Sequence, residues 1–120
     1  MIIPVEMIKS ISQKIIPAHT FLSDASAALK DRAAQRDALE GERSMARTVA
    51  LFNSFKGKEL LSETDGWLFM VFLKLIRGDQ GEFRSDDYVD AAGYVALAGE
   101  AKSEYFTKNL KFSPELSVEK

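Results

Sequence analysis

The spacing of apolar residues along the chain predicts helices and no strands. Apolar positions recur three and four residues apart in segments 7–16, 20–37 and 45–55, in the apolar run at 67–77, and again after Ser85. This period is that of helices, and no segment alternates convincingly with the period of two that a half-buried strand shows. We therefore predict an all-α fold, a compact bundle of about five helices.

Residues at the ends of these segments support the predicted boundaries. Pro17 follows the first segment, and the residue before a proline is disfavoured in a helix. Gly57 follows a basic last turn and is a suitable C-cap, while Ser62 is a suitable N-cap with acidic residues after it. The helix at 67–77 is apolar nearly all round, so we expect it to be the central helix, covered on several sides.

Size and composition indicate one small globular domain. The chain has 120 residues, of which 46% are hydrophobic and 28% are charged, which fits one modest core rather than a disordered chain. We predict a single helical domain over residues 1–106 and a mobile or docking C-terminal tail over residues 107–120.

Charge and residue counts exclude several classes of protein. The net charge of −2 makes a nucleic-acid partner unexpected, because such proteins usually carry a basic excess. With no cysteine and one histidine, the chain has no disulfide, no cysteine nucleophile and no zinc site of the usual kinds. The start does not resemble a signal peptide, and the longest apolar run is too short to cross a bilayer. We expect a cytoplasmic protein (in the host cytosol if a phage encodes it) with no membrane partner.

Charged residues of both signs gather around the loop between the last two predicted helices. These candidate ligand-binding residues are Lys74, Arg77, Arg84, Asp86, Asp87 and Asp90, with Tyr94 one turn further along. The cations could contact phosphate, and the carboxylates could hold Mg²⁺ through oxygen ligands. The same residues also fit a structural role, because acidic residues favour a first helical turn and Arg77 could pair with Asp90 between two helices.

A second candidate site surrounds Gly41, which interrupts the helical pattern. Arg36, Glu42 and Arg43 lie beside this break and could border a ligand. A plain turn between two helices accounts for the same residues, since mixed charge runs usually face solvent.

Aromatic residues of the apolar run also have two interpretations. Trp67, Phe69 and Phe72 could stack on a base. At helical spacing in an apolar segment, however, such residues are more typical of a hydrophobic core.

The segments 73–77 and 86–94 resemble a family of small phage and prophage proteins that is known only as a domain of unknown function. In that family a helix with Lys-x-x-Arg is followed by a short polar loop and then by Asp-x-x-Asp-x-x-Gly-Tyr. Residues 31–37 and 41–46 are similar to its longer members, so the similarity covers roughly residues 25–104. The resemblance implies a phage context.

A more distant similarity points to the all-α nucleotide pyrophosphohydrolases of the MazG and dimeric dUTPase kind. Asp87 and Asp90 are similar to one half of the magnesium site of those enzymes, a Glu-x-x-Asp pair. The other half, a Glu-x-x-Glu pair on the preceding helix, is replaced here by Lys74 and Arg77. The resemblance therefore implies a degenerate relative whose hydrolytic activity is weak or absent.

Together these patterns predict a helical phage-type protein that binds a nucleotide or nucleotide-like phosphate ligand. Lys74, Arg77 and Arg84 would contact phosphate, and Asp87 and Asp90 would orient these cations or hold Mg²⁺. The alternative is a non-enzymatic phage protein that binds and inhibits a host defence factor. We also expect a homo-oligomer, most simply a dimer, because the apolar helix and the Ala/Gly-rich last helix offer more apolar surface than five helices cover.

Overall fold

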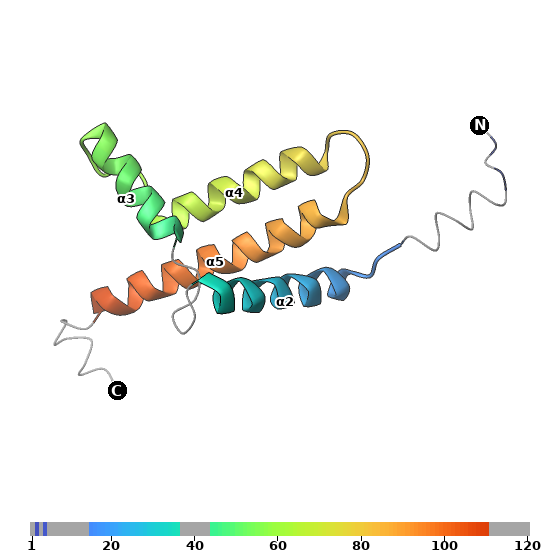
Figure 1. Cartoon of the computed structure of the whole chain (residues 1–120), viewed down its shortest axis with the longest axis horizontal. Coiled ribbons are helices and arrows are strands. Elements are labelled where there is room, and N and C mark those ends of the chain that lie inside the picture. The colour runs from blue at the N-terminus through green and yellow to red at the C-terminus, as the bar shows by residue number, and fades with distance from the viewer. Residues whose placement is uncertain (1, 3, 5–14, 37–43, 111–120) are drawn as a thin grey trace.

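A computed structural model describes residues 2, 4, 15–36 and 44–110, and throughout these ranges the fold is all-α. Four helices are present there, namely α2 (Ala18–Arg36), α3 (Ser44–Lys56), α4 (Glu63–Gly78) and α5 (Ser85–Leu110), without any strand (Figure 1). The helix predicted at 7–16 lies largely outside the described residues, so a total of about five helices stays a prediction.

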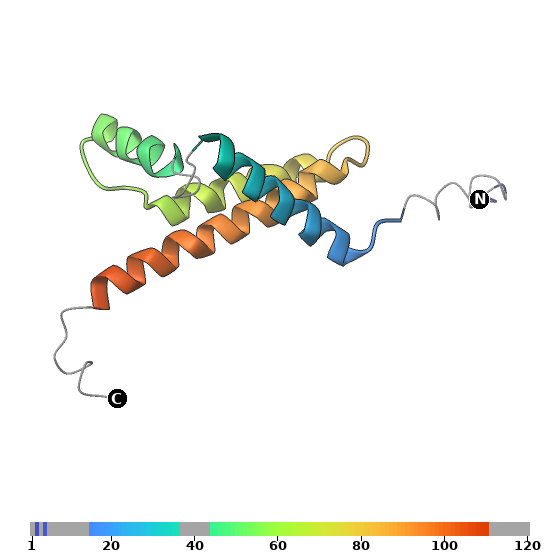
Figure 2. The same cartoon turned by 60° about the horizontal axis from the view of Figure 1, so that its bottom comes forward.

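The longest helix, α5, organises the fold. It packs against both α4 and α2, whereas α3 packs against α4. Figure 1 shows α4 and α5 as an antiparallel hairpin, and the turned view in Figure 2 shows α2 crossing α5. α3 begins beside the N-terminal end of α4 and diverges from it (Figure 1). This arrangement leaves much of α3 and one face of α4 without a neighbouring helix.

The predicted signals at the ends of α3 and α4 are confirmed. The backbone N–H of Gly57 donates to the Asn53 carbonyl over 2.9 Å, and Gly57 has a φ of 79°, which a glycine adopts without a Cβ clash. At the start of α4, Ser62 and Asp65 form a capping box, with N-to-O distances of 3.1 and 3.0 Å. The capping box satisfies two backbone donors at the start of the helix.

Asn53 joins α3 to the segment that leads into α4. Its side-chain oxygen accepts from the backbone N–H groups of Leu60 and Leu61 at 3.0 and 3.1 Å, and its Nδ2 donates to the Leu61 carbonyl at 2.8 Å. The residue is buried, with 8% of its surface exposed. Three satisfied hydrogen bonds compensate for the burial of the amide, and they fix where the chain turns back.

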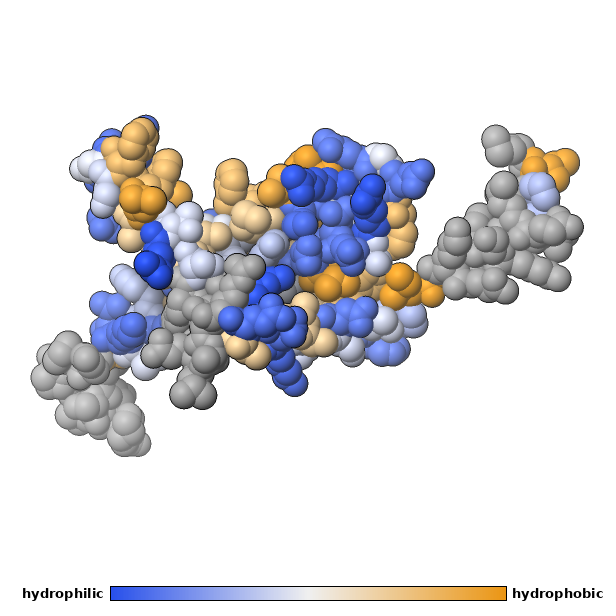
Figure 3. Space-filling model, in the orientation of Figure 1, coloured by the Kyte–Doolittle hydropathy of each residue, from blue (hydrophilic) through white to orange (hydrophobic). Residues whose placement is uncertain are grey.

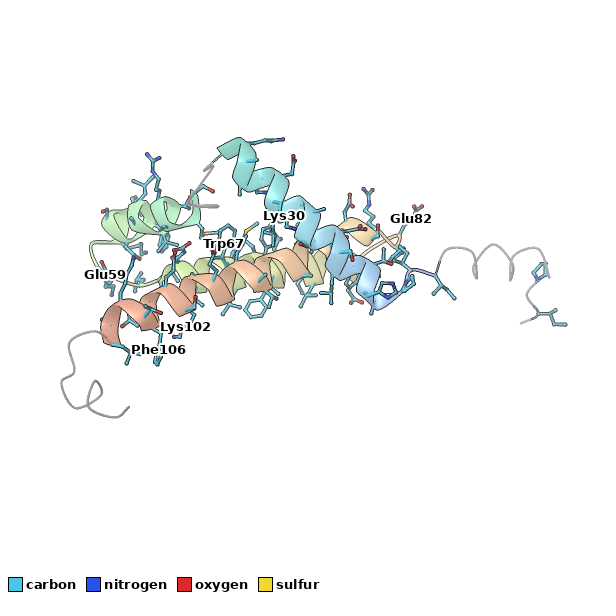
Figure 4. The ribbon with its side chains drawn as sticks, turned by 90° about the horizontal axis from the view of Figure 1, so that it is seen from below. Lys30, Glu59, Trp67, Glu82, Lys102 and Phe106 are labelled. Atoms are coloured by element: carbon cyan, nitrogen blue, oxygen red, sulfur yellow. The ribbon has the colours of Figure 1, made fainter. Side chains whose placement is uncertain are left out.

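The hydrophobic core is built on one large side chain and several small ones. Trp67 is 4% exposed and packs against Leu97, Ala98 and Ala101 of α5 (Figure 4). Its ring stacks on that of Tyr94 with a centroid distance of 5.7 Å, and its Nε1 donates to Glu63 over 3.2 Å. The small residues of α5 let α4 approach closely, so the core interpretation of Trp67 is confirmed.

The expected cover of the apolar helix on several sides is not confirmed. In α4, Phe69, Phe72 and Ile76 have 70%, 61% and 59% of their surface exposed. The reason is that, among the helices the structure describes, only α5 and, near the N-terminal end of α4, α3 pack against it. Within the described residues the core interpretation is therefore wrong for Phe69 and Phe72.

Two further expectations concern the ends and the surroundings of the chain. α5 continues past residue 106, the predicted end of the domain, to Leu110, and the rest of the predicted tail lies outside the described residues. Among the helices described here, none is long and apolar enough to cross a membrane.

Candidate ligand-binding site

The open end of the α4–α5 hairpin carries a hollow of about 450 Å³ lined by charged and polar side chains. We name it the ionic hollow, and its residues are Lys74, Arg77, Gln80, Arg84, Asp86, Asp87 and Asp90. Figure 3 shows hydrophilic side chains gathered over the C-terminal part of α4 and the loop after it. Its volume is within the usual range for small-molecule sites.

The loop between the two helices is held in shape by backbone hydrogen bonds and by one tyrosine. Gln80 N–H donates to the Arg77 carbonyl over 3.1 Å, and Gly81 has a φ of 69°. The Tyr88 hydroxyl donates to the Gly78 carbonyl over 3.2 Å, and a Cβ at Gly78 would lie 2.9 Å from that ring. Only glycine at position 78 allows this close approach, which brings the start of α5 against the end of α4.

The cations of the ionic hollow are not equivalent. The Lys74 ammonium forms an ion pair with Asp90 at 2.9 Å, and both side chains are largely buried. Within the described part of the chain, Arg77 and Arg84 form no ion pair, and both are exposed. The structural pair expected from the sequence therefore exists, but its cation is Lys74 and not Arg77. Two guanidinium groups stay available to an anionic ligand.

Asp87 is the most unusual residue of the hollow. It has only 8% of its surface exposed, and no hydrogen bond or ion pair to its carboxylate occurs among the residues described. The Asp87 carboxylate oxygens nevertheless reach solvent, because the described residues contain no buried side-chain oxygen or nitrogen without a hydrogen-bond partner. Since Asp87 also lines the ionic hollow, its carboxylate is a candidate for binding a ligand there, in the N-terminal turn of α5 where the helix dipole stabilises its negative charge.

The carboxylates alone are too few for a metal centre made only of protein ligands. No group of three or more histidine, cysteine, aspartate or glutamate side chains suited to a metal ion exists in the described ranges. Asp90 already holds Lys74, which leaves Asp87 and the exposed Asp86. Mg²⁺ is commonly bound by one or two carboxylates together with phosphates of a ligand, and this hollow offers such a partial set.

A second hollow, of about 340 Å³, lies next along the same side of the hairpin. We name it the Trp67–Tyr94 hollow, and its lining residues are Arg32, Ser44, Met45, Thr48, Trp67, Met70 and Tyr94. Met70 precedes Lys74 by one helical turn, and Tyr94 follows Asp90 by one turn, so each helix presents both hollows on one face. Along the α4–α5 hairpin, lining residues of one hollow therefore lie one helical turn from lining residues of the other.

The structure brings six of the seven main candidate residues together in the ionic hollow. The seventh, Tyr94, lies one turn away and lines the Trp67–Tyr94 hollow instead, because its ring turns toward Trp67. Of the secondary candidates, Arg36 ends α2 and its side chain is not described, while Glu42 and Arg43 lie outside the described residues.

Several polar residues that line these hollows were not among the candidates from the sequence, and Gln80 and Arg32 are the most informative of them. Gln80 lines the ionic hollow, and its position between Gly78 and Gly81 in a short polar loop was a usable signal. Arg32 lines the Trp67–Tyr94 hollow from α2. Its role depends on how α2 crosses α5, which no local pattern in the sequence reveals.

Comparisons with known proteins give a family but not a function. No curated protein and no solved structure matches this chain. The sequence matches a domain of unknown function, DUF6378, over residues 20–102, a range that includes α3, α4, the ionic hollow and nearly all of α2. The chain belongs to the DUF6378 family.

Proposed function

We propose that the protein binds a nucleotide as its Mg²⁺ complex, with the phosphates in the ionic hollow. Arg77 and Arg84 contact phosphate oxygens, and Lys74 adds a third positive charge beside them. Asp87 holds the Mg²⁺ ion that the phosphates also coordinate. As part of the same proposal, the chain is a degenerate cytoplasmic relative of the all-α nucleotide pyrophosphohydrolases with a phage origin.

The observation that carries this proposal is that Asp87, Arg77 and Arg84 line one hollow and that none of the three forms an ion pair with a described residue. A bare phosphate would be attracted by the arginines but repelled by the Asp87 carboxylate. A bare cation would be attracted by Asp87 but repelled by the arginines. A ligand that contains both charges, such as a magnesium phosphate, satisfies all three side chains at once.

The Trp67–Tyr94 hollow indicates which end of the hairpin the base of the nucleotide occupies. It adjoins the ionic hollow and offers the edge of a stacked aromatic pair, the Met70 thioether and the Arg32 guanidinium. Aromatic, methionine and guanidinium groups are the usual contacts of a flat base. We therefore place the base in this hollow, where Tyr94 contacts it, and the phosphates toward Arg84.

Thermal denaturation of the chain with a panel of nucleotides tests the proposal. A nucleotide at a hundred times its Kd is expected to stabilise the fold by about 2.7 kcal/mol, which is about 10 °C in Tm for a domain of this size. Removal of Mg²⁺ with a chelator should reduce the shift, and inorganic phosphate with Mg²⁺ should give a smaller one. In the variant Arg77→Ala, the Tm shift caused by the nucleotide should fall severalfold.

The matched control for this experiment is Lys30→Ala. Lys30 is an exposed cation on α2 that lines neither hollow, so its removal should leave the nucleotide shift unchanged. If the nucleotide-induced Tm shift fell equally in both variants, the effect would come from the net charge of the chain. That result would contradict a specific site. The absence of any shift with every nucleotide tried would favour the alternative, a protein-binding role without a small ligand.

We further expect little or no hydrolysis of the bound nucleotide. Attack on a phosphate needs a metal that keeps coordination sites for both water and substrate. Asp90 is occupied by Lys74 at 2.9 Å, so Asp87 is left as the buried carboxylate for the metal. Release of pyrophosphate from a nucleotide panel with Mg²⁺ or Mn²⁺ is the measurement. Robust turnover that disappears in Asp87→Ala would overturn this expectation and make the protein an enzyme.

A further inference from the structure

We propose that a second copy of this chain docks on an exposed apolar face formed by α3 and α4. We name it the docking face, and it consists of Leu51, Phe52, Phe55, Leu68, Phe69, Phe72, Leu75 and Ile76. The proposal does not depend on the nucleotide or on the ionic hollow. It concerns the side of α4 that neither α5 nor α3 covers.

The α4 part of the docking face is a continuous helical stripe. Its five residues follow one another at intervals of one, three, three and one, the spacing of one apolar face of a helix. Trp67 and Val71, by contrast, are buried and belong to the face that meets α5. α4 is thus a helix with two apolar faces, of which the described helices cover one.

The α3 helix likewise has one buried side and one exposed apolar side. Val49 and Asn53 are buried, and Val49 faces Gly66 at the point where α3 touches α4. On the other side Leu51 and Phe55 have 74% and 83% of their surface exposed. Because α3 diverges from α4 (Figure 1), this side has no neighbour among the described helices.

The size of the docking face matches what a stable dimer needs. With about 200 Å² for a full aromatic side chain, its eight residues leave on the order of 900 Å² exposed. Each partner of a standard interface buries about 800 Å², so the α3 part and the α4 part together are large enough for an interface in which each copy contributes both. An apolar surface of this extent on a small chain is expected to be covered in solution.

The charges that border the docking face identify the partner as another copy. The α3 helix has no acidic residue, and Arg47 and Lys56 lie one turn from Leu51 and Phe52 at the two ends of its apolar side. The α4 stripe is bordered at its two ends by acids, Asp65 one turn before it and Asp79 after it. These pairs span about 14 Å on α3 and about 21 Å on α4, a difference that long basic side chains can bridge.

The opposite charges at the ends of α3 and of the α4 stripe favour one docking arrangement over the others. Two α3 helices facing each other would bring cations together, and two antiparallel α4 helices would bring Asp65 close to Asp79 of the other copy. Placing α3 of one copy on the α4 stripe of the other pairs cations with carboxylates. A two-fold axis then repeats the contact, so each copy both gives α3 and receives it.

Light scattering after gel filtration of the full chain tests the proposal. The wild type should have twice the chain mass of 13.4 kDa at micromolar concentration. Phe72→Glu on α4 and Phe55→Glu on α3 should each raise the dimer Kd on the order of a hundredfold or more, because a buried charge would face an apolar surface. The matched control is Phe106→Glu, since Phe106 is 60% exposed on α5 near its C-terminal end, away from α3 (Figure 4). It should leave the mass unchanged.

A mixing experiment tests the reciprocal geometry. A chain with Phe55→Lys and a chain with Phe72→Glu should each be monomeric alone, yet together they should form a dimer with one wild-type contact and one Lys–Glu contact. A mixture that stays monomeric would overturn the docking of α3 on α4. A monomeric wild type would overturn the proposal as a whole and would assign the face to another occupant, such as the apolar segment 7–16 of the same chain.

Discussion

Replacement of Trp67 by alanine is expected to lower the free energy of unfolding by about 3–5 kcal/mol, the cost of removing a large buried aromatic side chain. Trp67 is 4% exposed and contacts three residues of α5, one face of Tyr94 and the Glu63 carboxylate. A domain of this size has a total stability of roughly 5–15 kcal/mol, so the variant should lose a large fraction of it. Urea denaturation followed by circular dichroism at 222 nm measures the change.

The control is an aromatic residue that is exposed. Phe106→Ala should change the free energy of unfolding by about 0.5 kcal/mol or less, as for most surface substitutions. If Trp67→Ala were as mild as this control, the core would not be centred on the contact between α4 and α5. The aromatic residue of α4 that matters most would then have to be one of those on the docking face.

Local sequence signals were sufficient to place the helices. Gly57 and Ser62 define an end and a start through backbone hydrogen bonds that involve residues at most four positions away. Such contacts depend on the residue type at a position and hardly on the rest of the fold. The predicted helix from 20 to 37 likewise differs from the observed α2 by two residues or fewer at each end.

Burial within the apolar run could not be predicted in the same way. Trp67, Phe69 and Phe72 have similar hydrophobicity, and the run gives no polar side from which to identify the outer face. Which of them is buried depends on where α5 and α3 lie, and that is set by contacts such as Gly66 with Met45 and Val49. A nearly uniform apolar pattern predicted complete cover, whereas the single chain covers only Trp67 of these three.

The sequence predicted which residues form the candidate site, but not which cation forms the ion pair with Asp90. Its residues come from the end of one helix, the following loop and the start of the next, so any tight hairpin brings them together. Lys74 and Arg77 are three residues apart and therefore differ by about 60° around the helix axis. That difference turns Lys74 toward α5 and Arg77 away from it, and the sequence alone could not decide which one meets Asp90.

The burial of Asp87 is the feature that best separates a binding site from a structural ion cluster. In a structural cluster each buried charge has a partner, and removal of one partner destabilises the fold by several kcal/mol. Asp87 has 8% of its surface exposed and no such partner among the described residues, yet its carboxylate oxygens reach solvent, while Asp86 beside it is exposed as a whole. The two residues are chemically identical and adjacent, and both lie in the first turn of α5.

Asp87→Asn is therefore expected to affect binding far more than stability. Without a ligand, the free energy of unfolding should fall by only about 0.5 kcal/mol, the worth of a helix-dipole interaction, because the Asp87 carboxylate has no protein partner to lose. With a nucleotide and Mg²⁺, the thermal shift of the wild type should be largely lost. Thermal denaturation of the variant with and without the ligand gives both values.

The same variant should also abolish the preference for magnesium. In the wild type the Asp87 carboxylate repels a nucleotide without Mg²⁺ and attracts one with it. The asparagine amide does neither, so the variant should bind the nucleotide about equally with Mg²⁺ and with a chelator. Asp86→Asn, the matched exposed control, should keep the wild-type response to magnesium. Destabilisation of the ligand-free Asp87→Asn chain by several kcal/mol would instead assign Asp87 to the fold, and the proposed magnesium contact would be wrong.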